Sequence, residues 1–172
     1  DRLMGIWTSK DYDIEVHRIE ADKLEELLKK YGKVSKVGKA FGILLMKIKG
    51  MQVDFSLPRS EVKTGSGHKG FEICTDPYLG FEKAAFRRDF TLNAIGLSVP
   101  QGEIEDPYSG VVDLKNKTLK HVSSAFGEDP LRALRAVQMI ARFGLVVAPE
   151  TVNICAEQDL SELAVERFDE EF

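Results

Sequence analysis

The sequence is poor in the features that mark secreted and membrane proteins. Its two cysteines, Cys74 and Cys155, lie far apart and form no C-x-x-C motif, which argues against a disulfide framework and favours a reducing, cytoplasmic setting. No apolar run approaches the roughly 18–20 residues that a membrane helix needs, and no signal-peptide pattern opens the chain. We therefore expect a cytoplasmic protein without a membrane partner.

Several sequence motifs of common enzyme classes are also missing. There is no G-x-G-x-x-G, no Walker loop, no zinc-ligand cluster and no Ser/His/Asp order. His17, His68 and His121 are scattered without metal-ligand spacing, so we expect them on the surface. These absences argue against a Rossmann dinucleotide site, a P-loop and a zinc centre.

The composition is that of a globular protein with an uneven charge. The chain has 172 residues, 43% of them hydrophobic and 30% charged, which predicts one domain and at most the start of a second. The net charge of −4 by itself argues against a general nucleic-acid binder. Residues 143–172 alone carry −7, however, which leaves +3 on residues 1–142. Since the chain does not begin with Met and ends within an acidic helical pattern, we interpret it as a fragment.

Hydrophobic periodicity predicts an α+β domain that leads into a helical one. The predicted elements are a strand over 11–16, a helix over 21–31, a hairpin over 42–49 and 51–57, a mobile loop over 60–70, a hairpin over 94–99 and 103–105, a turn into a short helix over 106–114, and helices over 129–143, 151–159 and from 161 onward. The same periodicity predicts which side chains face the core, namely Tyr12, Ile14, Val16, Leu24, Leu27, Leu28, Tyr31, Val53, Phe55, Leu57, Leu131, Leu134 and Val137.

Three carboxylates are candidates for a metal site. Asp11 and Asp13 are two residues apart on a predicted strand, so they project from the same face about 6–7 Å apart. This spacing suits a pair of divalent cations, and oxygen ligands of this kind suit Mg²⁺. Asp54 lies on the polar face of the predicted hairpin and would supply a third carboxylate. The alternative for all three is a solvent-exposed strand face, which is the usual position of Asp.

One arginine-containing segment has the residue types of a nucleotide contact. Arg88 precedes Asp89 and Asn93 within residues 87–94. A guanidinium binds phosphate oxygens in pairs, and Asp or Asn side chains suit ribose hydroxyls. A surface salt-bridge pattern is the alternative.

A second polar group lies at the start of the predicted helix over 129–143. Asp129, Arg132 and Arg135 step by three and form one slowly drifting stripe on its surface. A carboxylate acceptor beside a guanidinium donor can hydrogen-bond the edge of a nucleotide base. The alternative is a helix cap with an i, i+3 ion pair.

Taken together, four segments resemble the motifs of one family. They are Asp1-x-x-x-Gly5 with Lys10–Val16 (motif A), Arg87–Ala94 (motif B), Asp106–Leu114 (motif C) and Gly127–Arg135 (motif D). In this order and spacing they resemble the class II tRNA nucleotidyltransferases (CCA-adding enzymes) and bacterial poly(A) polymerases of the polymerase-β-like superfamily. Two features depart from the pattern. The chain begins at what resembles the last Asp of motif A, and Gln138 stands where many members carry Arg.

The resemblance implies a fold, a division into domains and an activity. The fold would be a polymerase-β-like nucleotidyltransferase head with a mixed β-sheet and flanking helices over residues 1–122, lacking its first strand and Gly-Gly motif. The start of an all-helical neck would follow over 123–172. The activity would be template-independent transfer of AMP or CMP from ATP or CTP to an RNA 3′ end, above all that of tRNA, with Mg²⁺ in a two-metal site. A poly(A) polymerase, an A-only or CC-only tRNA enzyme and a non-catalytic RNA-binding module stay open as alternatives, as does the oligomeric state.

The same resemblance assigns roles to the candidate residues. Asp11 and Asp13 match the metal carboxylates, and Asp54 falls where the family has Asp or Glu as a third catalytic carboxylate. The segment 60–70 resembles a flexible loop of the head. The nucleotide-binding residues that the resemblance implies are Arg88, Asp89 and Asn93 for phosphate and ribose, Asp129 and Arg132 for the base, and Arg135 for the triphosphate.

Overall fold

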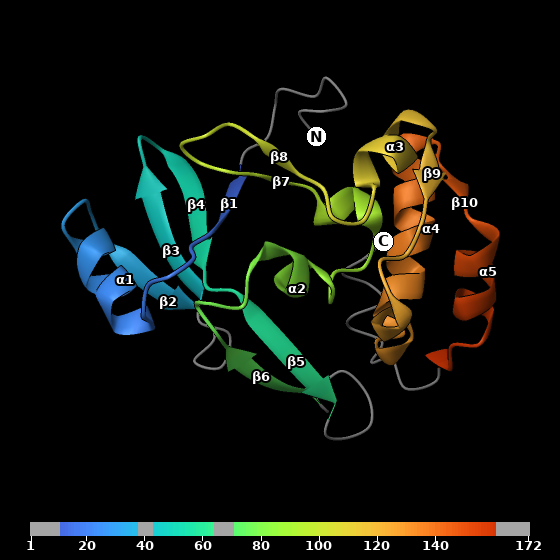
Figure 1. The fold of residues 1–172 in the computed structure, drawn as a ribbon, viewed down its shortest axis with the longest axis horizontal. Coiled ribbons are helices and arrows are strands. Elements are labelled where there is room, and N and C mark those ends of the chain that lie inside the picture. Colours follow the sequence, from blue (N-terminus) through green and yellow to red (C-terminus); the bar gives the residue numbers. More distant parts are fainter. Residues whose placement is uncertain (1–10, 38–42, 64–70, 161–172) are drawn as a thin grey trace. The chain divides into compact units, whose positions relative to one another are not determined.

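The chain folds as an α+β protein, as the sequence predicts (Figure 1). A computed structural model describes residues 11–37, 43–63 and 71–160. The backbone divides into two compact units, one of residues 1–62 and 73–80 and the other of residues 63–72 and 81–172.

The first unit is built on a mixed four-stranded sheet. Its strand order is β1-β4-β3-β2, with β1 (Asp11–Glu15) parallel to β4 (Met51–Ser56). The hairpin predicted over 42–57 is confirmed, because β3 (Ile43–Ile48) runs antiparallel to β4 and also to β2 (Val34–Val37). The predicted first helix is α1 (Ala21–Lys29).

One hydrophobic core lies between this sheet and α1. Val53, Phe55 and Leu57 are buried as the alternation predicts, and they pack with Leu24 and Leu28 of α1. Burial of such apolar side chains is the main term that favours folding.

Three predictions about this core were wrong. Tyr31 is 76% exposed because α1 ends at Lys29, so the helical period that would bring Tyr31 inward stops before it. Leu27 of α1 is also exposed, at 42%. Ile14 is likewise exposed, since β1 is the edge strand of the described sheet and has a neighbour on one side only.

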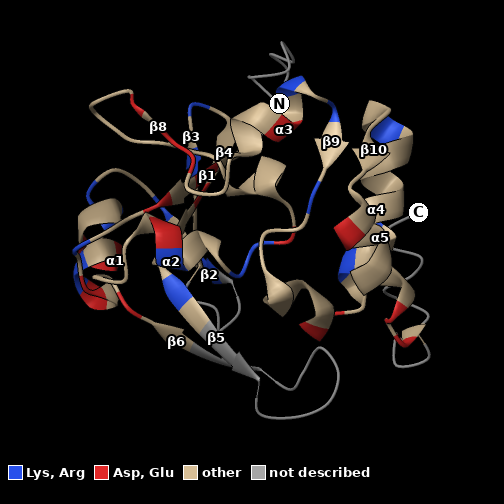
Figure 2. Cartoon of the chain, turned by 45° about the vertical axis from the view of Figure 1, so that its right-hand side comes forward, with Lys and Arg blue, Asp and Glu red and all other residues tan. Residues whose placement is uncertain are grey.

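The surface of α1 carries charges of both signs, which Figure 2 shows on the same helix. Glu25 accepts a bond from Lys29 one turn along at 2.8 Å and from Lys36 of β2 at 2.6 Å. These two ammonium groups lower the pKa of Glu25. The interaction joins α1 to β2 at the rim of the core.

The predicted loop over 60–70 is partly strand. Residues 60–63 belong to β5 (Arg59–Lys63), which pairs with β6 (Phe71–Thr75). The local Gly and Ser content indicated a loop, whereas the partner strand that makes this segment a strand comes eight residues later. Residues 64–70 of that prediction lie outside the described residues.

The second unit consists of short elements around one longer helix. The predicted hairpin over 94–105, the short helix within 106–114 and the helix over 129–143 are all present. Gly144, with a φ of 62°, ends the longer helix as predicted. In chain order the elements are α2 (Phe81–Ala85), the 3-10 helix η2 (Thr91–Ala94), β7 (Gly96–Leu97), β8 (Ile104–Glu105), α3 (Gly110–Lys115), β9 (Thr118–Leu119), the 3-10 helix η3 (Ser124–Glu128), α4 (Leu131–Phe143), β10 (Val146–Val147) and α5 (Pro149–Ala156).

The core of this unit forms around two aromatic side chains. Phe90 and Phe126 are fully buried with ring centroids 5.4 Å apart, and Ala136 of α4 packs with them. Leu131 and Leu134 of α4 are also buried, as predicted.

The prediction that Val137 is buried was wrong, since its side chain is 50% exposed. Residues 131, 134 and 137 are each three apart, so the third lies about 120° around the helix from the first. Ala136 occupies the buried side instead. Within the described ranges, no helix is both long and apolar enough to cross a membrane.

Candidate active site

The candidate carboxylates of the first unit come together through the parallel pairing of β1 and β4. Asp13 is directly opposite Asp54 in the register, and Asp11 is opposite Gln52. Register partners on adjacent strands share a face of the sheet, so Asp13 and Asp54 are lateral neighbours. Asp13 is exposed and Asp54 is half-buried, while the side chain of Asp11 lies outside the described part of the structure.

Neighbouring polar groups hold part of this face in place. Gln52 Nε2 donates to Asp54 Oδ1 at 3.1 Å, which orients that carboxylate. Two residues beyond Asp13, on the same strand face, Glu15 Oε1 lies 3.1 Å from His17 Nε2. Glu15 is therefore engaged by a side chain of its own segment.

The donor chemistry of this face fits Mg²⁺. Mg²⁺ prefers oxygen ligands and is commonly held by one or two carboxylates while it keeps water and phosphate in its shell. Asp13 and Asp54 supply two carboxylates on adjacent strands. Among the described residues there is no group of three or more His, Cys, Asp or Glu side chains that could hold a metal ion by itself. The contribution of Asp11 stays a prediction.

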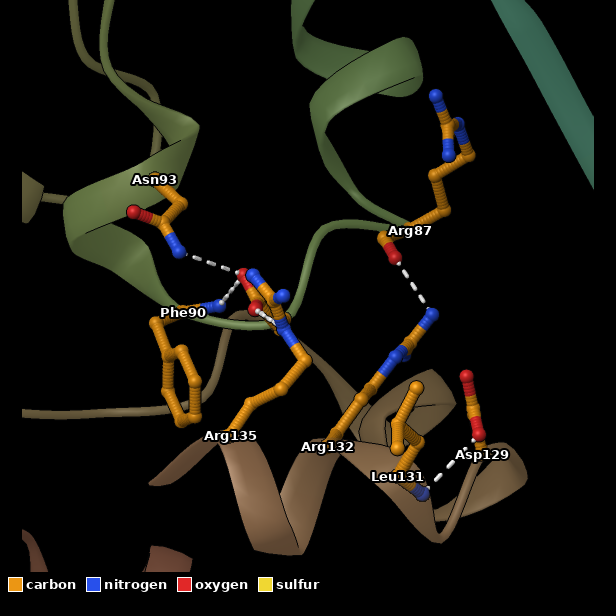
Figure 3. Close-up of polar contacts among 8 residues, drawn as sticks. Arg87, Phe90, Asn93, Asp129, Leu131, Arg132 and Arg135 are labelled. Carbon is orange, nitrogen blue, oxygen red and sulfur yellow. Dashed lines mark hydrogen bonds and ion pairs between the residues drawn. The ribbon is translucent and has the colours of Figure 1, made fainter. Parts of the chain in front are cut away.

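In the second unit, Asp89 is the centre of a hydrogen-bond network, and its partners Phe90, Asn93 and Arg135 are labelled in Figure 3. Its Oδ1 accepts bonds from the backbone N–H of Phe90 at 2.7 Å and from Asn93 Nδ2 at 2.9 Å. Its Oδ2 accepts from Arg135 Nε of α4 at 2.9 Å. The predicted candidates Asp89, Asn93 and Arg135 are thus in direct contact.

Arg88 contacts the same segment. Its Nη1 donates to the backbone carbonyl of Asn93 at 2.7 Å, and its guanidinium lies 5.5 Å from the centroid of the Phe81 ring. A guanidinium above an aromatic face is attracted by the ring quadrupole. The contact of Arg88 with Phe81 was not predicted from the sequence.

Asp129 and Arg132 lie one turn apart at the start of α4 but bind different groups. Asp129 Oδ1 accepts from the backbone N–H of Leu131 at 3.1 Å, which is a capping interaction. Arg132 donates from Nη1 to the carbonyl of Ala125 at 2.7 Å and from Nη2 to the carbonyl of Arg87 at 2.8 Å. No ion pair between Asp129 and Arg132 is present among the described residues, so that part of the alternative interpretation was wrong.

Motif C supports the segment that carries Asp89, a role that the sequence analysis missed. Asp113 Oδ2 accepts from the buried hydroxyl of Thr91 at 2.7 Å, and Asp106 accepts from the N–H groups of Gly110 and Val111 at 2.6 and 2.9 Å. A Cβ at Gly110 would lie 2.1 Å from the carbonyl oxygen of Thr91, so only glycine allows this approach. The spacing of Asp106, Gly110 and Asp113 was visible in the sequence, but its partner at Thr91 was not.

The model of one known family matches more than half of the chain. The model of the family described as "Poly A polymerase head domain" matches residues 1–120. The chain belongs to this family.

Several proteins similar to this chain are CCA proteins or CCA-adding enzymes by name. The "Multifunctional CCA protein" of Psychromonas ingrahamii is 41% identical over 165 residues, which cover 92% of this chain and 38% of that protein. Two solved structures of CCA-adding enzyme, one with ATP and one with CTP, superpose with TM-scores of 0.78 at 26% and 27% identity. Each covers 98% of this chain, and this chain covers 38% and 40% of them.

A solved structure that contains tRNA is also similar to this member of the poly A polymerase head domain family. It is the Thermotoga maritima CCA-adding enzyme complexed with tRNA, with a TM-score of 0.68 and 26% identity over 89% of this chain and 34% of that one. The chain thus spans about 38% of the length of the curated relative from Psychromonas ingrahamii. The shared polymerase-β-like head agrees with the predicted fold class.

Proposed function

We propose that the whole protein transfers AMP and CMP from ATP and CTP to the 3′ end of tRNA, and so adds and repairs the terminal CCA. The observation that carries the proposal is the register of β1 and β4, which sets Asp13 beside Asp54 on one sheet face. Family membership and the names of the relatives support the reaction class. A cytoplasmic location stays a prediction from the cysteine content.

In the reaction, the 3′-hydroxyl of the RNA gives up its proton to solvent, and its oxygen forms a bond to the α-phosphorus of the nucleotide. The bond from that phosphorus to the bridging oxygen breaks, and pyrophosphate leaves with its electron pair. Asp13 and Asp54, together with Asp11, would hold Mg²⁺ on the β1–β4 face. When bound, Mg²⁺ ions lower the pKa of the attacking hydroxyl and neutralise the leaving pyrophosphate.

The residues of the second unit would bind the nucleotide. Arg88 and Arg135 are cations suited to the triphosphate, and Asp89 and Asn93 are suited to the ribose. The base would be read by protein side chains instead of a template. Asp129 and Arg132 are assigned to that task.

The proposed catalytic and nucleotide-selecting roles are assigned to two consecutive parts of the chain. We assign residues 1–122 to the catalytic head and residues 123–172 to the neck, in which α4 carries Arg132 and Arg135. On this view the two carboxylates of the β1–β4 face do the chemistry, and the start of α4 selects the nucleotide.

One gel tests the proposal. Full-length protein is incubated with Mg²⁺ and with tRNA that lacks CCA, CA or only A, each with ATP, CTP, GTP or UTP. We expect CMP on the first two substrates and AMP on the third. Asp13→Ala should add nothing, whereas Asp22→Ala, an exposed acid on α1, should act like the wild type.

The alternatives leave different products on the same gel. Long A tails identify a poly(A) polymerase, and addition of only A or only C identifies a partial tRNA enzyme. If none of the wild-type reactions yields a product, an enzymatic function is contradicted. The names of the relatives favour complete CCA addition over these outcomes.

A further inference from the structure

Asp89 uses its two oxygens on different partners. Oδ1 accepts two bonds, from the N–H of Phe90 and from Asn93 Nδ2, whereas Oδ2 accepts one, from Arg135 Nε. Each carboxylate oxygen has about two lone-pair sites. A further donor can therefore approach Asp89 through Oδ2, the same oxygen that holds Arg135.

The environment makes this carboxylate a firm anchor. The side chain of Asp89 is only 10% exposed, and that of Arg135 is 40% exposed, so the pair lies at the boundary between the core and solvent. Phe90, the next residue, is fully buried and fixes the backbone beside Asp89. Donation through Nε also fixes the plane in which the two Nη atoms of Arg135 lie.

We propose that Asp89 couples ribose recognition to triphosphate binding, because Oδ2 would accept the ribose 2′-hydroxyl while it holds Arg135 in its phosphate-binding orientation. Asp89 is then a positioning residue for Arg135 as well as a ribose contact. The inference rests on the proposed function, in which a ribonucleoside triphosphate is the substrate. A nucleotide that lacks the 2′-hydroxyl cannot make the ribose contact, so its binding reports only how Asp89 positions Arg135.

The experiment compares the dissociation constants of ATP and dATP for the full-length protein in Mg²⁺ without tRNA. The proteins are the wild type, Asp89→Asn, Arg135→Gln and the double variant. Arg142→Gln is the matched control, since it removes the same charge from the same helix, where Arg142 lies 4.8 Å from the Phe143 ring. Thermal unfolding of each variant establishes that it is folded.

We expect Arg135→Gln to weaken ATP binding and to reduce the preference for ATP over dATP. Each effect should be about tenfold, because hydrogen bonds to charged groups have effects of this order. Asp89→Asn should also reduce both the affinity for ATP and the preference for ATP over dATP. The double variant should be only slightly worse than either single variant, because the two residues act as a unit. Arg142→Gln should leave the ATP-to-dATP ratio unchanged.

Two results separate failure of this inference from failure of the proposed function. If Arg135→Gln weakens ATP and dATP by the same factor, or if the two substitutions are additive, the coupling is overturned while the enzymatic function stands. If the wild type binds neither nucleotide, both proposals fail. If it binds both but extends no tRNA, only the proposed function fails, and the ratio still decides the coupling.

Discussion

Arg132 makes two contacts that a base-reading side chain would have to exchange for the base. Its Nη1 and Nη2 atoms donate to the carbonyls of Ala125 and Arg87, which come from two separate segments. A lysine at this position has one ammonium group and cannot reproduce the planar fork. At the scale of the residue, Arg132 thus has a structural role that is measurable apart from its proposed role in base selection.

We predict that Arg132→Lys lowers the free energy of unfolding by about 2 kcal/mol, because at least one carbonyl loses a charged donor. It should also relax the preference for ATP and CTP over GTP and UTP. Thermal unfolding and single-nucleotide incorporation measure the two effects. Arg142→Lys on the same helix is the control. An unchanged unfolding temperature would contradict the carbonyl contacts, and an unchanged nucleotide preference would remove the base-reading role.

How far the sequence predicts this site depends on the distance between partners along the chain. The face shared by Asp13 and Asp54 follows from two alternating patterns, so the sequence placed both on polar strand faces, although not in one register. The contact of Arg132 with Arg87 spans 45 residues, and that of Arg135 with Asp89 spans 46. Local periodicity carries no information about such pairs, which depend on the packing of whole elements.

At the scale of elements, one buried hydroxyl joins the segment that follows β9 to α5. Thr151 at the start of α5 is fully buried, and its Oγ1 accepts from the backbone N–H of His121 at 3.0 Å and lies 2.8 Å from His121 Nδ1. Since a hydroxyl has two acceptor lone pairs and one proton, Oγ1 can bond Nδ1 as well as the backbone N–H, and the direction of that second bond depends on the tautomer of the ring. We expected His121 on the surface, but the residue is partly buried, and its ring centroid lies 5.7 Å from that of Phe126.

We predict that this junction weakens in acid. Burial lowers the pKa of His121 below its ordinary value of 6.5, with Glu150 acting to raise it and Lys120 to lower it. The unfolded chain therefore binds the proton first, so stability is fully present above about pH 6.5 and is lost as the pH falls towards the lowered pKa. Denaturant unfolding between pH 8 and pH 5 measures this loss.

The matched variant is His121→Asn, which should lose less stability over this pH range than the wild type. A wild-type curve that is flat from pH 8 to pH 5 would contradict the role of His121. The exposed ion pair of Lys120 with Glu150, at 3.1 Å, adds little to this dependence because solvent screens it.

The same scale shows why element prediction succeeded in some places and failed in others. The hairpin of β3 and β4 and the helix α4 have strong periodicity and clear ends, such as Gly144, and both are as predicted. The strand β5 and the short α2 have no such signal, since β5 is defined by its pairing with β6 and α2 is little more than a single turn. Val137 and Tyr31 were predicted to be buried but are exposed, although both helices were predicted. Which face of a helix is buried depends on tertiary packing as well as on its own sequence.

At the scale of the whole molecule, stability and the proposed chemistry lie in different places. Each unit has its own apolar core, one centred on Val53 and Phe55 and the other on Phe90 and Phe126. The carboxylates of the β1–β4 face belong to neither core, because Asp13 is exposed and Asp54 has a hydrogen-bond donor in Gln52. Neither carboxylate is a buried charge that only a cation could neutralise. Folding should therefore not depend on Mg²⁺.

We therefore predict that removal of divalent cations stops nucleotide addition but leaves the fold intact. In EDTA, tRNA extension by the full-length protein should fall below detection, while the unfolding temperature drops by no more than a few degrees, because the ion stabilises the folded state only by its own binding free energy. Asp13→Ala, in which the proposed cation site is broken, should unfold at the same temperature with and without EDTA. Added Mg²⁺ should restore extension in the wild type alone. Global unfolding in EDTA would show that the cation is structural, and undiminished extension would remove the β1–β4 face from the mechanism.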